Sequence, residues 1–230
     1  MAESSRRKIP TRRRTAPHPT QPSTQSTSIE GWISVEERRY EFIQIWKNKA
    51  IISPKYINSR KFIAAGFEFL TLFNFQGIRK FVQMQGKYYP DLVRVFYYNL
   101  KIRDEVAYSR VKGVDIIIDN DIWENVAKFS INDATESILN GIAGFNRILA
   151  YQSFLRNLTQ DVGKQLLDKG LKIDERLIHY LIVWILCPRG TKHAHCSEVD
   201  LLIMYGILNR VPIKWSSLIL DTMLKAKRYP

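Results

Sequence analysis

The chain has 230 residues, of which 45% are hydrophobic and 12% aromatic, so it holds enough apolar side chains for one packed domain. Its formal net charge of +13 and its pI of about 9.8 favour anionic partners, nucleic acid first and acidic membrane surfaces second. Two cysteines exclude a disulfide-stapled secreted domain, and a longest apolar run of 11 residues, 177–187, excludes a predicted membrane span, which needs about 20.

The first thirty residues differ in composition from the rest of the chain. Residues 1–30 contain six Lys or Arg side chains, four prolines and almost no large apolar side chains, so we expect a disordered tail. Its two basic clusters suit a nuclear import signal or an arm that contacts nucleic-acid phosphates, although a solvated tail without a partner has the same composition. The basic residues are Arg6, Arg7, Lys8, Arg12, Arg13 and Arg14.

Order is expected to begin at Ser34. Residues 34–37 match the capping box, and Tyr40, Ile43 and Trp46 recur at helical spacing behind it. The pattern predicts a helix over 35–48 with these three side chains on its buried face.

The next segment, residues 66–86, is aromatic and strongly apolar. Its first half fits a strand or a buried helix equally well, and residues 76–85 predict a short helix. Pro90 then suits the first position of a helix, where its missing N–H is no loss. That helix carries an apolar stripe formed by Leu92, Phe96 and Leu100.

Residues 105–121 change to the alternating pattern of a strand. Lys112-Gly113 supplies a turn, so the segment predicts a two-stranded β-hairpin. Asp119 or Asn120 can cap the helix that follows.

The last hundred residues read as helices. Residues 130–160 hold short helical patterns, and Asp174 is expected to cap a helix that ends at Cys187. Ser197 begins a second helix with a capping signal, and a third is expected over 214–226. Together these elements predict a mainly α, irregular helical domain over 34–230 with one small β-hairpin.

The connection 187–196 gathers Cys187, His193, His195 and Cys196. As zinc ligands they would have a spacing that matches neither a C-x2-C pair nor a zinc finger. Cys196 with His193 would be a catalytic pair, but no Gly-rich oxyanion turn accompanies them. We therefore favour a polar interhelical loop, with both thiols free.

Other polar groups also have a structural interpretation. Asp115, Asp119 and Asp121 lie close together, but they lack the glycine and the late glutamate of a calcium loop. His179 falls in a buried helix and is expected to be a core histidine. We assign no catalytic, cofactor or metal residue.

A group of tyrosines near Arg94 and Lys101 has two interpretations. Their rings could stack nucleic-acid bases, but at helical spacing we favour core and rim positions. The tyrosines are Tyr88, Tyr89, Tyr97 and Tyr98.

Three blocks of sequence resemble a known family, the plant transposon protein domain that is abundant in legume genomes and associated with retroelements. The resemblance runs from about Gly66 to the last residue and implies no catalytic residue set. It also implies that the domain continues into further helices beyond Pro230. The blocks are KYYPDLVRVFYYNL, SRVKGVDIIID and RLIHYLIVWILCPRGTKHAHCSEVDLLIMYGILNR, the last followed by WSSLILDTMLKAKR.

These observations lead to one expected function and two alternatives. We expect a transposon-derived, non-enzymatic module of the nucleus or cytoplasm that associates with nucleic acid through its basic tail or with other proteins, without a membrane. The first alternative is a capsid-like retroelement module that self-associates. The second is a degenerate metal-dependent nuclease or transposase.

Overall fold

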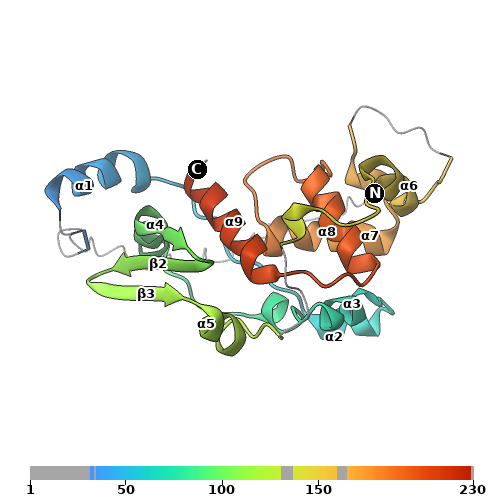
Figure 1. The fold of residues 1–230 in the computed structure, drawn as a ribbon, viewed down its shortest axis with the longest axis horizontal. Helices are drawn as coiled ribbons and strands as arrows, with labels where there is room; N and C mark the ends of the chain where they lie inside the picture. Colours follow the sequence, from blue (N-terminus) through green and yellow to red (C-terminus); the bar gives the residue numbers. More distant parts are fainter. Residues whose placement is uncertain (1–31, 34, 131–136, 160–164, 229–230) are drawn as a thin grey trace, which may run out of the picture.

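The computed structural model of the chain describes residues 32–33, 35–130, 137–159 and 165–228. Within these ranges it contains nine α-helices, several short 3₁₀ and π-helical turns, and one three-stranded antiparallel sheet (Figure 1). The prediction of a mainly helical domain with a small β-element is confirmed. The expected disorder of residues 1–30 lies outside the described residues.

The elements follow the chain in a simple order. The α-helices are α1 (Glu36–Glu41), α2 (Ser59–Ala64), α3 (Phe69–Phe75), α4 (Pro90–Asn99), α5 (Asn120–Asn125), α6 (Arg147–Phe154), α7 (Ile173–Leu181), α8 (Glu198–Leu208) and α9 (Trp215–Arg228). Two π-helical turns, η2 (Phe42–Trp46) and η6 (Ile182–Leu186), extend α1 and α7. The strands are β1 (Lys101–Arg103), β2 (Val106–Val111) and β3 (Val114–Ile118).

Three helix starts form where the sequence predicts them. Pro90 is the first residue of α4, and the Asp119 carboxylate accepts the Ile122 N–H at 3.2 Å to cap α5. At α8 the capping box is complete, because Ser197 and Asp200 each accept the other's backbone N–H.

One predicted cap was not found, and another lies outside the described residues. Asp174 does not cap α7: Lys172 precedes the helix, and Asp174 lies in the first turn, where the helix dipole still favours a carboxylate. Val35 is the residue before α1 and makes no side-chain cap, while the expected cap Ser34 lies outside the described residues.

The predicted buried face of the first helix is right for Trp46 and wrong for Tyr40 and Ile43. Tyr40 is 69% exposed and Ile43 is exposed, whereas Phe42 and Trp46 are buried. Phe42 and Trp46 lie four residues apart, so they share one helical face, and both rings pack edge to face on Tyr98 of α4. The contact with α4 therefore decides which face is buried. A π-helical turn follows α1, in which the Lys47 N–H donates to the Phe42 carbonyl at 2.9 Å.

The aromatic segment 66–86 forms one helix, α3, and then an irregular turn. Gly77 has φ of +72°, which ends the helical path, so the predicted helix over 76–85 shrinks to a 3₁₀ turn at Phe81–Gln83. Ile78 and Val82 are nevertheless fully buried.

The sheet has the order β1-β2-β3. The predicted hairpin is confirmed as β2 and β3, joined by Lys112 and Gly113, which both have positive φ. Strand β1 was not predicted, and it pairs with β2 across a second two-residue turn, Asp104-Glu105.

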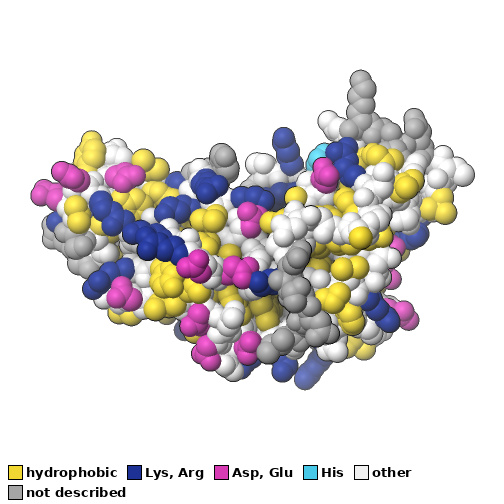
Figure 2. All heavy atoms as spheres, viewed as in Figure 1, with side chains coloured by type: hydrophobic (Ala, Val, Ile, Leu, Met, Phe, Trp, Pro, Cys, Tyr) yellow, Lys and Arg dark blue, Asp and Glu magenta, His cyan; other side chains and the backbone are white. Residues whose placement is uncertain are grey.

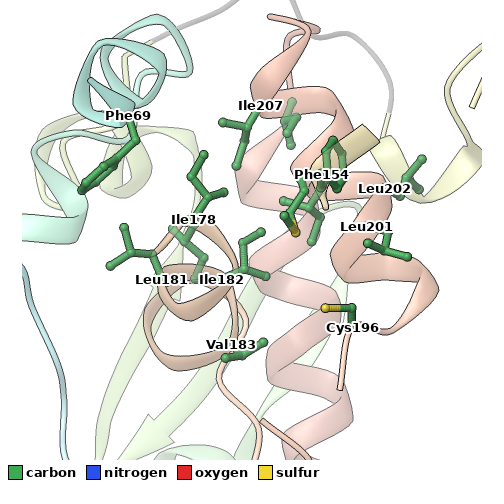
Figure 3. Packing of buried hydrophobic residues seen from close by; sticks show 14 of the residues in the cluster. Phe69, Phe154, Ile178, Leu181, Ile182, Val183, Cys196, Leu201, Leu202 and Ile207 are labelled. Carbon is green, nitrogen blue, oxygen red and sulfur yellow. The ribbon is translucent and has the colours of Figure 1, made fainter. Parts of the chain in front are cut away.

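The hydrophobic core has a helical part and a part beneath the sheet. The helical part lies between α3, α6, α7 and α8, where Figure 3 shows Ile178, Ile182 and Leu201 converging from α7, η6 and α8. Beneath the sheet, Ala107 of β2 packs with Trp123 of α5 and Leu220 of α9. Helix α9 runs between the sheet and the helical part (Figure 1) and contributes to both.

Candidate nucleic-acid interface

The three-stranded sheet has one buried and one solvent-exposed face. Ala107, Ser109 and Val111 of β2 are buried against the helices, and the Ser109 hydroxyl donates to the Phe96 carbonyl of α4 at 2.8 Å. Because side chains alternate along a strand, the intervening residues Tyr108 and Arg110 point to the opposite face.

That opposite face combines cations with exposed apolar side chains. The strand register places Lys101, Tyr108 and Ile117 side by side across the three strands. Tyr108 is 40% exposed and Ile117 is 49% exposed. Arg103 of β1 and Arg110 of β2 share the face and are exposed. We call these five residues the basic sheet face.

One cation of this face has a local partner. The Nε atom of Arg110 lies 3.6 Å from an Oδ1 atom of Asp115, its neighbour across β2 and β3. Both side chains are largely exposed, and such surface pairs contribute little to stability. A phosphate can therefore compete with Asp115 for the guanidinium group.

Further cations lie at the β1 edge of the sheet. The Lys227 ammonium of α9 donates to the Leu100 carbonyl at 2.7 Å, and the Arg38 guanidinium of α1 donates to the Asn99 side chain at 2.8 Å. Burial lowers the pKa of Lys227, and the charges of Arg38 and Lys101 lower it further. The Glu41 carboxylate acts on this pKa in the opposite sense, so the charged form of Lys227 has both like and opposite charges near it.

The space-filling view agrees with this concentration of charge. Figure 2 shows Lys and Arg side chains gathered over α4 and β2, beside a group of hydrophobic side chains over β3. Cations of this kind contact phosphates, and an exposed aromatic ring offers a surface on which a base can stack.

The end of the sheet at the β1–β2 turn is acidic. Glu105 accepts hydrogen bonds from Lys214 and Ser217, which hold the pKa of its carboxyl below the ordinary value. Asp121 accepts from Asn125 at 2.8 Å. These carboxylates border a hollow of about 240 Å³ lined by Asp104, Glu105, Val106, Asp119, Asn120 and Asp121.

The predicted group of three aspartates is thus divided. Asp119 and Asp121 border the hollow, where Asp119 is the α5 cap, while Asp115 pairs with Arg110 on the basic sheet face. Among the described residues, no three His, Cys, Asp or Glu side chains are grouped so that they could hold a metal ion.

The connection 187–196 is organised around Arg189. Its guanidinium donates to Asp200 at 2.8 Å and to the His195 carbonyl at 2.6 Å. The His193 ring stacks on Trp184 with centroids 3.8 Å apart, and its Nε2 lies 2.6 Å from the Arg189 carbonyl. These contacts fix the conformation of a loop between two helices.

The two thiols of this connection are poorly suited to nucleophilic chemistry. Burial raises the pKa of Cys187 and of Cys196 to about 12 in each case. Because the thiolate is the reactive form, neither side chain is activated at neutral pH.

A buried polar cluster joins α7 to α8. Asp200 is buried, and its Oδ2 atom lies 3.6 Å from Nε2 of fully buried His179, a distance too long for a hydrogen bond. Burial alone raises the pKa of the Asp200 carboxyl, but His179, Ser197 and Arg189 together outweigh it and hold the pKa below its ordinary value. The carboxylate is therefore the stabilised form of Asp200, and neither ring nitrogen of His179 has a hydrogen-bond partner among the described residues.

The four predicted tyrosines differ in their positions. Tyr98 is buried and donates to the Glu41 carboxylate at 2.7 Å, and Tyr97 is half-buried, so the prediction of core and rim positions is confirmed for this pair. Tyr88 and Tyr89 are exposed. The exposed ring on the sheet, Tyr108, was missed, although its alternation with Ala107 and Ser109 is visible in the sequence.

The six cations of the basic tail, Arg6, Arg7, Lys8, Arg12, Arg13 and Arg14, lie outside the described residues. No helix in the described part of the chain has the length and hydropathy that a bilayer span requires. Comparison of the chain with family models, with curated proteins and with solved structures finds no match, so the resemblance to the plant transposon protein domain stays a prediction.

Proposed function

We propose that this chain is a non-enzymatic module that binds nucleic acid through the basic sheet face, in the nucleus or the cytoplasm. The observation that carries the proposal is the register that places Lys101, Arg103 and Arg110 around the exposed Tyr108 on one face of the sheet. In this proposal the basic tail adds phosphate contacts that position the ligand without reading its sequence. A transposon-derived origin would suit such a role.

The chemistry of the described residues favours binding over catalysis. A degenerate nuclease would need carboxylates that converge on metal ions. The carboxylates at the acidic end of the sheet instead cap a helix or accept hydrogen bonds from Lys214, Ser217 and Asn125. A cysteine hydrolase would need an activated thiol, whereas burial raises both thiol pKa values.

The test replaces two cations of the basic sheet face. Lys101→Gln with Arg103→Gln is expected to weaken binding of a fluorescent oligonucleotide by about tenfold at low salt, because two phosphate contacts are lost. Fluorescence anisotropy over a salt series should show the slope of log K against log salt reduced by about 1.4 for a single strand.

Arg60→Gln with Lys61→Gln is the matched control. These two exposed side chains lie on α2, away from the sheet (Figure 1), and their replacement changes the net charge by the same amount. If both double variants weaken binding equally, the affinity comes from overall charge and the assignment to the sheet is wrong. Deletion of residues 1–30 in the same assay tests the tail. If the tail contacts phosphates, the deletion must reduce the slope of log K against log salt.

Asp115→Asn is expected to strengthen binding by about two- to fivefold at low salt. The change removes the carboxylate that competes with phosphate for Arg110, and it removes one negative charge from the face. Anisotropy titration of the same oligonucleotide measures the effect. Asp174→Asn, an equal change of charge in the first turn of α7, should leave the affinity within about twofold; a gain of the same size there would contradict the role of Asp115.

A further inference from the structure

We infer that the ligand of the basic sheet face is a single strand of nucleic acid, with one base stacked on the ring of Tyr108. This inference rests on the proposed function and adds the class of ligand to it. Its basis is the central position of Tyr108, with Lys101 directly opposite on one side and Ile117 directly opposite on the other.

The side chains of the central row suit the parts of a nucleotide. Residues directly opposite on neighbouring strands have Cβ atoms about 5 Å apart, so the three side chains form one continuous surface. The exposed ring of Tyr108 offers a face to a base, and the exposed Ile117 beside it extends the apolar surface. Lys101 then lies where the phosphate attached to a stacked nucleotide can reach it.

A duplex lacks what this surface recognises. Its bases are stacked on one another, so their faces are not available to a protein ring, and direct readout requires an element that enters a groove. Helices α4, α5 and α9 pack against the buried face of the sheet, and the described residues place no helix on the other face. The basic sheet face is therefore an open platform, and the described part of the chain adds no element to it that could enter a groove of a duplex.

The platform is held in place from behind. The Asn99 side chain donates to the Arg110 carbonyl at 2.7 Å, and the Ser109 hydroxyl donates to the Phe96 carbonyl at 2.8 Å. Ala107, beside Tyr108, is fully buried. A backbone fixed in this way needs little ordering when a ligand binds, which lowers the entropic cost of binding.

The distribution of charge around the sheet predicts the path of the bound strand. The β1 edge carries the cations Arg38, Lys101 and Lys227, while the β1–β2 turn end carries the carboxylates that line the hollow at Asp104 and Asp119. Phosphates are attracted to the first region and repelled by the second. The strand should therefore cross the central row toward the β1 edge and avoid the acidic end.

The experiment compares a single strand with a duplex of the same length. A fluorescent oligothymidylate or oligouridylate of about 12 nucleotides should bind more tightly than a 12-base-pair duplex at equal salt. Tyr108→Ala should weaken single-strand binding by about 5- to 150-fold, the range that base–aromatic stacking supplies, and leave duplex binding within about twofold. Tyr108→Phe, which keeps the ring, should retain the wild-type affinity.

Tyr40→Ala is the control, since Tyr40 is an exposed tyrosine of α1 outside the basic sheet face. Its replacement should leave single-strand binding unchanged.

Photo-crosslinking of wild-type protein to a 5-iodouracil oligonucleotide needs no variant and should label the tryptic peptide 104–110, which contains Tyr108. Equal single-strand and duplex affinities, or a crosslink that avoids this peptide, would overturn the inference. If Lys101→Gln with Arg103→Gln still weakens binding in that case, the proposed function survives; if no oligonucleotide binds at low salt, both fail.

Discussion

Asp200→Ala is expected to lower the free energy of unfolding by about 3–4 kcal/mol. The carboxylate accepts hydrogen bonds from the Arg189 guanidinium at 2.8 Å and from the Ser197 N–H at 2.7 Å, and it lies beside buried His179. Removing it leaves a partly buried cation without its counter-charge and opens the capping box of α8. Chemical denaturation followed by circular dichroism measures the loss.

Glu198→Ala is the matched control for this change. Glu198 occupies the same first turn of α8 but is exposed, so its removal should cost about 0.3–1 kcal/mol through the helix dipole alone. Equal losses in the two variants would show that the buried cluster contributes nothing beyond an ordinary first-turn carboxylate.

The same residue gives stability a dependence on pH. The pKa of Asp200 is lower in the folded chain than its ordinary value of about 3.9, so its contribution is fully present above that value. It is lost as the pH falls through the folded pKa, because protonation then favours the unfolded chain. Unfolding of Asp200→Asn, which keeps the side-chain shape, should therefore differ from wild type most at pH 6 and progressively less toward pH 3.

Local chemistry explains which parts of the fold could be predicted from the sequence. The capping box at Ser197, the first-turn proline Pro90 and the cap Asp119 act over three or four residues, so their patterns are complete in the sequence. The face of α1 could not be predicted in this way. Trp46 is buried as expected, but its buried neighbour is Phe42, while Tyr40 and Ile43 are exposed. Which face is buried depends on the contact with Tyr98 of α4, which the local pattern does not contain.

Of the two turns in the candidate site, one could be predicted from the sequence and the other could not. Lys112-Gly113 contains a glycine that accommodates positive φ, so the turn and the hairpin were predicted. Asp104 and Glu105 also have positive φ, 49° and 59°, but Glu105 occupies the second position, where such turns usually carry glycine. Strand β1 was therefore missed, and with it the register that places Lys101 beside Tyr108.

Phe73→Ala is expected to cost about 3–5 kcal/mol, or a fall in Tm on the order of 10 °C. Phe73 is fully buried in the helical part of the core, and its ring meets that of Phe69 edge to face with centroids 5.5 Å apart. The change removes this contact and leaves a cavity where α3 packs against α8. Denaturant unfolding and thermal melting measure the effect.

Phe75→Ala is the control for this change. It removes the same type of side chain from α3, two residues further along, but at a position that is 46% exposed. It should cost less than about 1 kcal/mol, and Phe73→Leu, which refills part of the cavity, should recover part of the loss. A Phe75→Ala effect as large as that of Phe73→Ala would mean that α3 presents a different face to the core. The capped helix α8 would then need another partner for the surface that α3 now covers.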